Sequence, residues 1–190
     1  MAALTPMMQQ YMEVKNQYKD CILFYRLGDF YEMFFDDALT ASKVLEITLT
    51  GRDCGQPERA PMCGVPYHAC DVYLNKLIEN GFKVAICEQV EDPKLAKGIV
   101  KREVIRVVTP GTNMSNAILD ETRNNYLMSI FENDGAFGIS LVDITTGEFK
   151  TARVPSLSKL TDEINKYSPA EIIGNHSFMN CDLDFVYLRE

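Results

Sequence analysis

The sequence predicts an α/β protein: a mixed sheet flanked by helices, followed by a second, incomplete α/β domain. Two observations carry this prediction. Apolar, β-favouring runs alternate with helical patterns over the first 110 residues, which is typical of a sheet covered by helices. After a polar stretch, the pattern changes to a three-stranded meander followed by a helix and a short strand. We therefore expect one domain over residues 1–113, a linker over 114–125, and the first part of another domain over 126–190.

The first 50 residues are expected to form two helices and two strands. Thr5 and Pro6 match a helix N-cap and the proline that is favoured at the first helical position. Gly28 ends the first apolar run. The pattern predicts, in order, a helix from residue 6, a strand over 21–27, a helix from 31 or 32 to about 45, and a strand over 47–50.

The following 60 residues continue the alternation around two loops. Residues 51–66 contain three glycines and three prolines, which predict a surface loop. Asn80 and Gly81 are a typical helix end, and Asp92-Pro93 opens a second, lysine-rich loop. The expected elements are a helix from about 68 to 79 and strands over 82–89 and 102–108.

The pattern after the polar stretch predicts a separate structural unit. The turn sequences Asn133-Asp134-Gly135 and Thr145-Thr146-Gly147 divide three apolar runs into a meander. The expected elements are strands over 127–131, 137–144 and 148–154, a helix over about 158–167, a short strand over 171–173, and a new strand-like start at 184.

Composition indicates an ordinary globular protein without a general attraction to nucleic acid. The chain is 46% hydrophobic and 24% charged, and no apolar run approaches the roughly 20 residues that cross a bilayer. The first residues lack a signal-peptide pattern, so a cytoplasmic protein is expected. Net charge is −8, with −2 on residues 1–115 and −6 on residues 116–190. Any contact with nucleic acid must therefore be local, or supported by other regions of a larger protein.

The six cysteines do not form a metal-binding pattern. No CxxC occurs, and no pair of histidines lies nearby, whereas zinc sites need closely spaced soft ligands. The cysteines are expected to be reduced thiols, partly buried.

The segment from Phe24 to Phe34 (FYRLGDFYEMF) is the most informative stretch. It places an aromatic and an acidic residue directly after a strand that ends in glycine. Taken alone, Glu32 fits the first turn of a helix, where the dipole favours an acid. Phe30 and Tyr31 fit a buried strand–helix corner. Local chemistry by itself therefore predicts structural roles for these residues.

A longer resemblance changes that interpretation. The segment GDFYEMFFDDA, preceded by LFYRL, resembles the mismatch-recognition motif of the MutS family, whose centre is Phe-x-Glu. Four other stretches match the family in order and spacing: TPMMQQY at 5–11, PMCGVPYHA at 61–69, VAICEQVEDP at 84–93 and VIRVVTPGT at 104–112. The resemblance covers residues 5–150, and the rest fits the family's connector domain more loosely. It implies an N-terminal fragment comprising a mismatch-recognition domain and part of a connector.

The resemblance implies that two residues contact a mispaired base in DNA. Phe30 matches the aromatic wedge that enters the minor groove and stacks on a mispaired base. Such a wedge costs a few kcal/mol of unstacking, least where pairing is already poor. Stacking on an aromatic returns roughly 1–3 kcal/mol per base, so insertion is favoured only at deformable sites. Glu32 matches the acid that hydrogen-bonds the same base. It would do so if protonated beside phosphates, and its charge would repel undamaged DNA.

Other positions match the family less specifically. Arg52 and Met62 correspond to residues near the DNA backbone. Lys94, Lys97, Lys101 and Arg102 form a basic cluster, for which a solvated loop or strand edge is an equally good interpretation. Cys63 needs no functional role, and His68 is expected to be structural.

An enzymatic alternative rests on the second domain. Residues 139–149 resemble the first hairpin of ribonuclease-H-like folds, in which a strand aspartate binds catalytic metal; Asp143 holds that place here. A metal-dependent nuclease or small-ligand enzyme using Asp143 is the alternative function. Two-metal hydrolysis needs several converging carboxylates, and the sequence offers Asp143 no evident partners.

The resemblance also implies what a complete family member would do. No GxxxxGK[ST] motif occurs, so this fragment is not expected to be an enzyme or to bind a cofactor. The full-length protein is expected to be an ATPase that uses ATP and Mg, to form a homodimer, and to act with a MutL-type partner. Its expected substrate is double-stranded DNA with mismatches or small loops, and its expected location is the cytoplasm, associated with the nucleoid.

Overall fold

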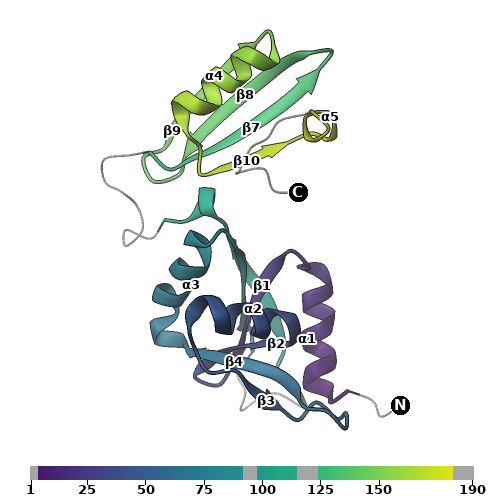
Figure 1. Ribbon diagram of the computed structural model, residues 1–190. Helices are drawn as coiled ribbons and strands as arrows, with labels where there is room; N and C mark the ends of the chain where they lie inside the picture. The colour runs from purple at the N-terminus through teal and green to yellow at the C-terminus, as the bar shows by residue number, and fades with distance from the viewer. Residues whose placement is uncertain (1–3, 92–97, 115–123, 182–190) are drawn as a thin grey trace. The chain divides into compact units, whose positions relative to one another are not determined.

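The computed structural model describes residues 4–91, 98–114 and 124–181, and it divides into two compact units, Met1–Thr109 and Pro110–Glu190 (Figure 1). Each unit contains a mixed sheet with helices, so the predicted fold class is confirmed. The strand-like start at 184 lies outside the described residues, as does most of the expected linker.

The first unit is a six-stranded sheet with the order β3-β4-β2-β1-β5-β6. β1 and β5 run parallel, and every other neighbouring pair is antiparallel. Its helices and strands are α1 (Pro6–Gln17), β1 (Cys21–Leu27), β2 (Phe30–Phe34), α2 (Phe35–Leu45), β3 (Thr50–Arg52), β4 (Ala60–Pro66), the 3-10 helix η1 (Tyr67–Ala69), α3 (Cys70–Glu79), β5 (Lys83–Gln89) and β6 (Arg102–Val108).

Alternation along the strands divides the interior of this unit into two cores. Ile22 and Phe24 of β1 pack with α2 and α3, whereas Leu23 and Tyr25 pack on the opposite face with α1. Because successive strand residues point to opposite faces, the first five residues of the central strand β1 each meet a helix-covered layer. This explains why residues 21–25 are an unbroken apolar run, whereas Arg26 and Leu27 are only partly buried.

Three sequence predictions for this unit are wrong in the same region. The helix expected from Tyr31 or Glu32 begins only at Phe35, because residues 30–34 form strand β2. The strand expected over 47–50 begins at Thr50 instead. The segment 51–66 is not simply a loop: its last seven residues form β4, which lies between β3 and β2. The prolines Pro61 and Pro66 lie at or next to the ends of β4, where a strand tolerates them best.

The remaining predictions for this unit hold with small shifts. α1, β1, α3, β5 and β6 are confirmed. Pro6 occupies the first turn of α1 as expected, but the Thr5 side chain makes no capping hydrogen bond. The Thr5 backbone N–H instead donates to the carbonyl of Cys54, so the start of α1 is tied to the β3–β4 loop.

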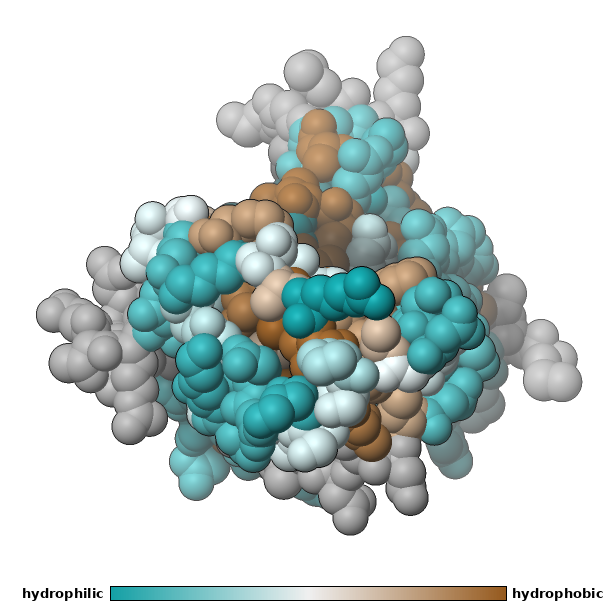
Figure 2. All heavy atoms as spheres, turned by 90° about the horizontal axis from the view of Figure 1, so that it is seen from above, coloured by the Kyte–Doolittle hydropathy of each residue, from teal (hydrophilic) through white to brown (hydrophobic). Residues whose placement is uncertain are grey.

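The second unit is a four-stranded sheet with the order β10-β7-β8-β9, and its core lies under α4 on one face. Its elements are the 3-10 helix η2 (Pro110–Thr112), β7 (Tyr126–Asn133), β8 (Ala136–Asp143), β9 (Glu148–Val154), α4 (Leu157–Tyr167), β10 (Glu171–Gly174) and α5 (His176–Met179). The predicted meander, helix and short strand are confirmed. Figure 2 shows apolar areas in brown between hydrophilic areas in teal on the face it views.

Candidate nucleic-acid interface

The hairpin between β1 and β2 carries the residue predicted to be the wedge. Leu27 and Phe30 pair across a two-residue loop of Gly28 and Asp29. Gly28 has φ of +57°, the left-handed region that the first loop position of such a hairpin requires. The Phe30 side chain is at the end of the sheet, and the residue is 46% exposed. Core packing is therefore wrong for Phe30. It is right for Tyr31, which points to the opposite face and is 6% exposed.

Glu32 lies two residues further along β2, on the same face as Phe30. The helix-dipole interpretation is wrong for it, because α2 begins three residues later. The Glu32 carboxylate is instead paired with the Arg52 guanidinium, with 2.5 Å between Oε2 and Nη1. The Glu32 side chain is 16% exposed and that of Arg52 is 39% exposed. The pair is thus partly sheltered, and Arg52 is its more accessible half.

The two residues predicted to lie near the DNA backbone occupy neighbouring strands. Arg52 is the last residue of β3, opposite Ala60. Met62 of β4 pairs with Thr50 on one side and Phe34 on the other. Met62 is partly buried and packs against the core under α1. The structure therefore brings Arg52 to Glu32 and places Met62 at the end of β2 that is remote from Phe30.

Gly64 is a residue of this site that the sequence prediction missed. It pairs directly with Glu32 across β2 and β4. A Cβ at this position would lie 3.3 Å from the Tyr31 carbonyl oxygen and 3.5 Å from Glu32 Cγ. A side chain here would press on the backbone beneath Glu32. The signal was present in the motif PMCGVPYHA, but only the strand pairing shows which residue needs the glycine.

The described members of the basic cluster are engaged within the chain. Lys101 pairs with Glu103 at 2.5 Å. Arg102 is 8% exposed; it donates to the carbonyls of Arg26 and Val100 and to the Gln10 side chain. Lys94 and Lys97 lie outside the described residues. These contacts favour the structural interpretation of Lys101 and Arg102.

Cys63 and His68 differ in their surroundings. Cys63 is fully buried under α2, and burial raises the pKa of its thiol to about 12, which is typical of a core cysteine. His68 is exposed in η1 and its ring lies edge-on to that of Tyr67, with 5.9 Å between the centroids.

Asp143, on which the enzymatic alternative depends, is an anchor for a turn. It is fully buried and accepts hydrogen bonds from the backbone of Asn125, Thr145 and Thr146 and from the Thr145 hydroxyl. Burial acts to raise its pKa, but these hydrogen bonds prevail and lower the pKa below its ordinary value. Within the described ranges, no group of three or more His, Cys, Asp or Glu side chains is placed to hold a metal ion. The geometry fits a structural carboxylate.

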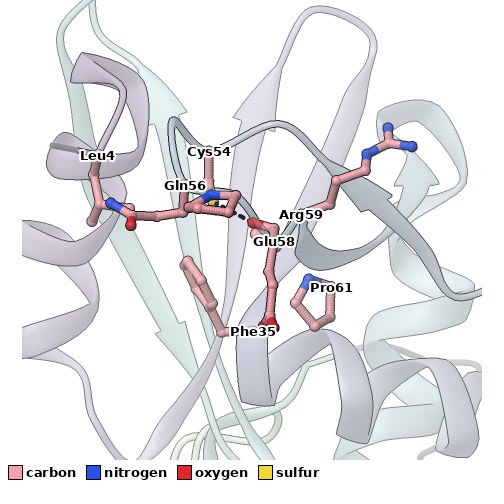
Figure 3. A pocket seen from close by; sticks show the side chains of 9 residues that line it. Leu4, Phe35, Cys54, Gln56, Glu58, Arg59 and Pro61 are labelled. Carbon is pink, nitrogen blue, oxygen red and sulfur yellow. Dashed lines mark hydrogen bonds between the residues drawn. The ribbon is translucent and has the colours of Figure 1, made fainter. Parts of the chain in front are cut away.

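A separate cavity lies at the other end of β2, beside the β3–β4 loop (Figure 3). Its volume is about 490 Å³, and Phe35, Cys54 and Pro61 line it with the Gln56 and Glu58 side chains. Figure 3 shows the Arg59 guanidinium pointing away from it. None of the predicted site residues lines this cavity, so it is distinct from the hairpin surface.

Comparisons with known proteins agree with the order of these elements. The model of MutS domain I matches residues 5–117, and that of MutS domain II matches residues 125–183. The chain is 70% identical over its whole length to the DNA mismatch repair protein MutS of Lachnoclostridium phytofermentans. It is 64% identical over 95% of its length to that of Acetivibrio thermocellus, and 59% identical over 98% to that of Clostridioides difficile.

This chain spans about a fifth of the length of these curated relatives: 20%, 21% and 19% of the three proteins. Among the described residues, no helix is long and apolar enough to cross a membrane. Two family models match the two structural units in order. The chain therefore belongs to the MutS family.

Proposed function

We propose that the β1–β2 hairpin probes base pairs in duplex DNA, with Phe30 as the wedge and Glu32 as the acid that contacts the same base. The observation that carries the proposal is the exposure of Phe30, 46%, at the tip of a two-residue hairpin. A large aromatic that leaves about half of its surface exposed at such a tip has a free ring face, which can stack on a base that has lost its partner. Glu32 lies behind it on the same face of β2.

We propose that Arg52 and Met62 flank this probe towards the DNA backbone. The Arg52 side chain is 39% exposed beyond its ion pair with Glu32, which supports a phosphate contact from its outer edge. Met62 lies further along the sheet and is less accessible, so its contribution is expected to be smaller.

The decisive test is Phe30→Ala in the complete protein that contains this sequence. Loss of one stacked base removes roughly 1–3 kcal/mol, so the preference for a mismatched over a matched duplex should fall about tenfold or more. Affinity for the matched duplex should stay within a factor of two, since the wedge is not inserted there. Fluorescence anisotropy with both duplexes measures this. A preserved preference would show that Phe30 is not the wedge.

For the complete protein we propose an ATP- and Mg-dependent homodimer that acts with a MutL-type partner, in the cytoplasm at the nucleoid. The relatives are named DNA mismatch repair protein MutS, which supports a role of the complete protein in mismatch repair. The dependence on ATP and Mg, the homodimer, the MutL-type partner and the location rest on the resemblance to the family. No residue of this chain is assigned to ATP, because the sequence has no GxxxxGK[ST] motif.

The alternative function, metal-dependent hydrolysis through Asp143, has its own test. A magnesium-dependent cleavage assay that compares the chain with its Asp143→Asn variant tests it directly. Cleavage lost on that substitution would mean that DNA probing is not the chain's whole function.

A further inference from the structure

The Arg26 side chain contacts the turn that precedes Phe30. This residue lies on the opposite face of the sheet from Phe30, because it pairs with Tyr31. Its Nε–H donates to the Gly28 carbonyl at 2.6 Å, which places a hydrogen bond on the first residue of the hairpin loop. Its Nη1 lies 3.4 Å from the Glu88 carboxylate of β5. The side chain is only 18% exposed.

Tyr67 holds the second residue of the loop. Its backbone N–H donates to the Asp29 carbonyl at 2.9 Å. The Arg26 guanidinium covers the Tyr67 ring at 3.9 Å from the centroid, and it also lies 5.6 Å from the Tyr31 centroid. The Tyr31 hydroxyl donates to the Glu88 carboxylate. Gly28 and Asp29 are therefore fixed by two residues that stack on each other, and Glu88 secures that stack to the sheet.

We propose that Arg26 is a positioning residue for Phe30, acting through Gly28 and Tyr67 rather than by touching DNA; this inference rests on the proposed function of the hairpin. A planar guanidinium serves here because it donates to a carbonyl and stacks on a ring at the same time. A loose hairpin would lose conformational entropy each time it entered the duplex, and that loss would be subtracted from the stacking free energy. A hairpin that is already ordered avoids it.

The test is a double-mutant cycle between Arg26→Met and Phe30→Ala in the complete protein. Arg26→Met alone should lower the mismatch preference at least fivefold and leave affinity for the matched duplex unchanged. Combined with Phe30→Ala, it should produce no further loss, because both changes act through the same inserted ring. The slope of log K against log salt should not change, whereas loss of a phosphate contact would reduce it by about 1.

Three results would overturn the inference. One is a further loss of preference when Arg26→Met is added to Phe30→Ala, and another is a smaller salt slope. The third is an unchanged preference in Arg26→Met while Phe30→Ala has lost it, which refutes the role of Arg26 alone. If Phe30→Ala itself keeps the preference, the proposed function and this inference both fail.

Further variants separate positioning from general destabilisation. Hydrogen exchange should rise in Arg26→Met at residues 27–31 and stay unchanged in α1 and β5. Arg26→Lys should recover only part of the preference, because an ammonium cannot stack and bridge as the guanidinium does. Tyr67→Ala, at a residue 44% exposed, should reproduce part of the loss without unfolding the unit, because it removes the ring that Arg26 stacks on and keeps the backbone N–H that donates to Asp29. Arg59→Met, at an exposed arginine of the β3–β4 loop, is the matched control and should leave the preference intact.

Discussion

At the scale of single residues, one step along β2 separates the proposed probe from a core residue. Phe30 and Tyr31 are adjacent aromatics, yet the first is 46% exposed and the second 6%. Strand alternation sends them to opposite faces, and Tyr31 joins the core that packs with α2 and α3. The sequence prediction gave Phe30 and Tyr31 the same buried role because it placed a helix start there, but residues 30–34 form strand β2.

Replacing Glu32 by Gln should tighten binding to the matched duplex and lower the mismatch preference. The substitution removes a negative charge from the hairpin face and releases Arg52 from its ion pair. Because the freed guanidinium is available to any phosphate, the gain is not selective. Anisotropy titrations with both duplexes measure it. Glu103→Gln, which breaks the exposed pair with Lys101, is the control and should change neither value. An unchanged preference in Glu32→Gln would remove Glu32 from discrimination.

Replacing Gly64 by Ala should disturb Glu32 without changing any charge. The new Cβ would meet the Tyr31 carbonyl oxygen at 3.3 Å, so β2 and β4 must separate slightly under Glu32. We expect a loss of about 1 kcal/mol in the free energy of unfolding. Gly138→Ala is a matched strand glycine whose Cβ meets only a carbonyl oxygen at 4.0 Å, and it should stabilise or be neutral. Equal effects of the two substitutions in urea denaturation would contradict the close approach at Gly64.

At the scale of elements, the β8–β9 turn shows how a buried carboxylate serves structure. Asp143 ends β8, and its oxygens accept from Thr145, Thr146 and Asn125, which joins the turn to the residue just before β7. In all of these hydrogen bonds the Asp143 carboxylate is the acceptor. An ionised carboxylate suits this place, because it accepts hydrogen bonds and donates none.

Asp143→Asn should therefore destabilise the second unit by about 1–3 kcal/mol, since the amide would turn N–H groups towards backbone N–H groups. The effect should depend on pH. The native pKa of Asp143 is lowered, so its contribution is fully present above the unfolded pKa of about 3.9 and is lost as pH falls through the native pKa. The difference between the wild-type chain and Asp143→Asn should be constant above about pH 5 and shrink below pH 4. Hydrogen exchange in β7, β8 and β9 under mild denaturant measures it; a difference that grows towards low pH would contradict this role.

At the scale of the whole molecule, charge limits what this chain can do alone. Net charge is −8, and several cations of the first unit already have acidic partners: Lys15 with Asp37, Arg26 with Glu88, Arg52 with Glu32, Lys76 with Glu46, Lys83 with Asp20 and Lys101 with Glu103. Among the described residues of this unit, these pairs reduce the number of cations available to phosphates. We therefore propose that the hairpin is a local probe and that other parts of the complete protein hold the DNA.

The 190-residue chain should accordingly bind duplex DNA weakly and with a shallow salt dependence. We expect a slope of log K against log salt of about −1 to −2, which corresponds to one or two phosphates. Anisotropy between about 50 and 200 mM salt measures the slope, with the complete protein as the reference. A slope that corresponds to six or more phosphates would show that the chain holds DNA by itself.

Much of the fold follows from patterns that are local in the sequence. The apolar run of β1, the proline at the start of α1 and the Asn-Asp-Gly turn between β7 and β8 each specify their element with little help from the rest of the chain. The resemblance that singled out Phe30 and Glu32 was also readable in the sequence, and it led to the family to which the chain belongs.

Tertiary structure alone decided the arrangement around the hairpin. β2 is rich in aromatics and β4 contains Gly and two Pro, and both become strands because each has a neighbour on both sides. The same pairing puts Arg52 against Glu32 and Gly64 beneath it, and it brings Tyr67 to Asp29, 38 positions away in the sequence. Strand pairing and ion pairs join residues that are distant in sequence. Their free energy arises only when the sheet assembles, so the local propensity of each segment does not predict them.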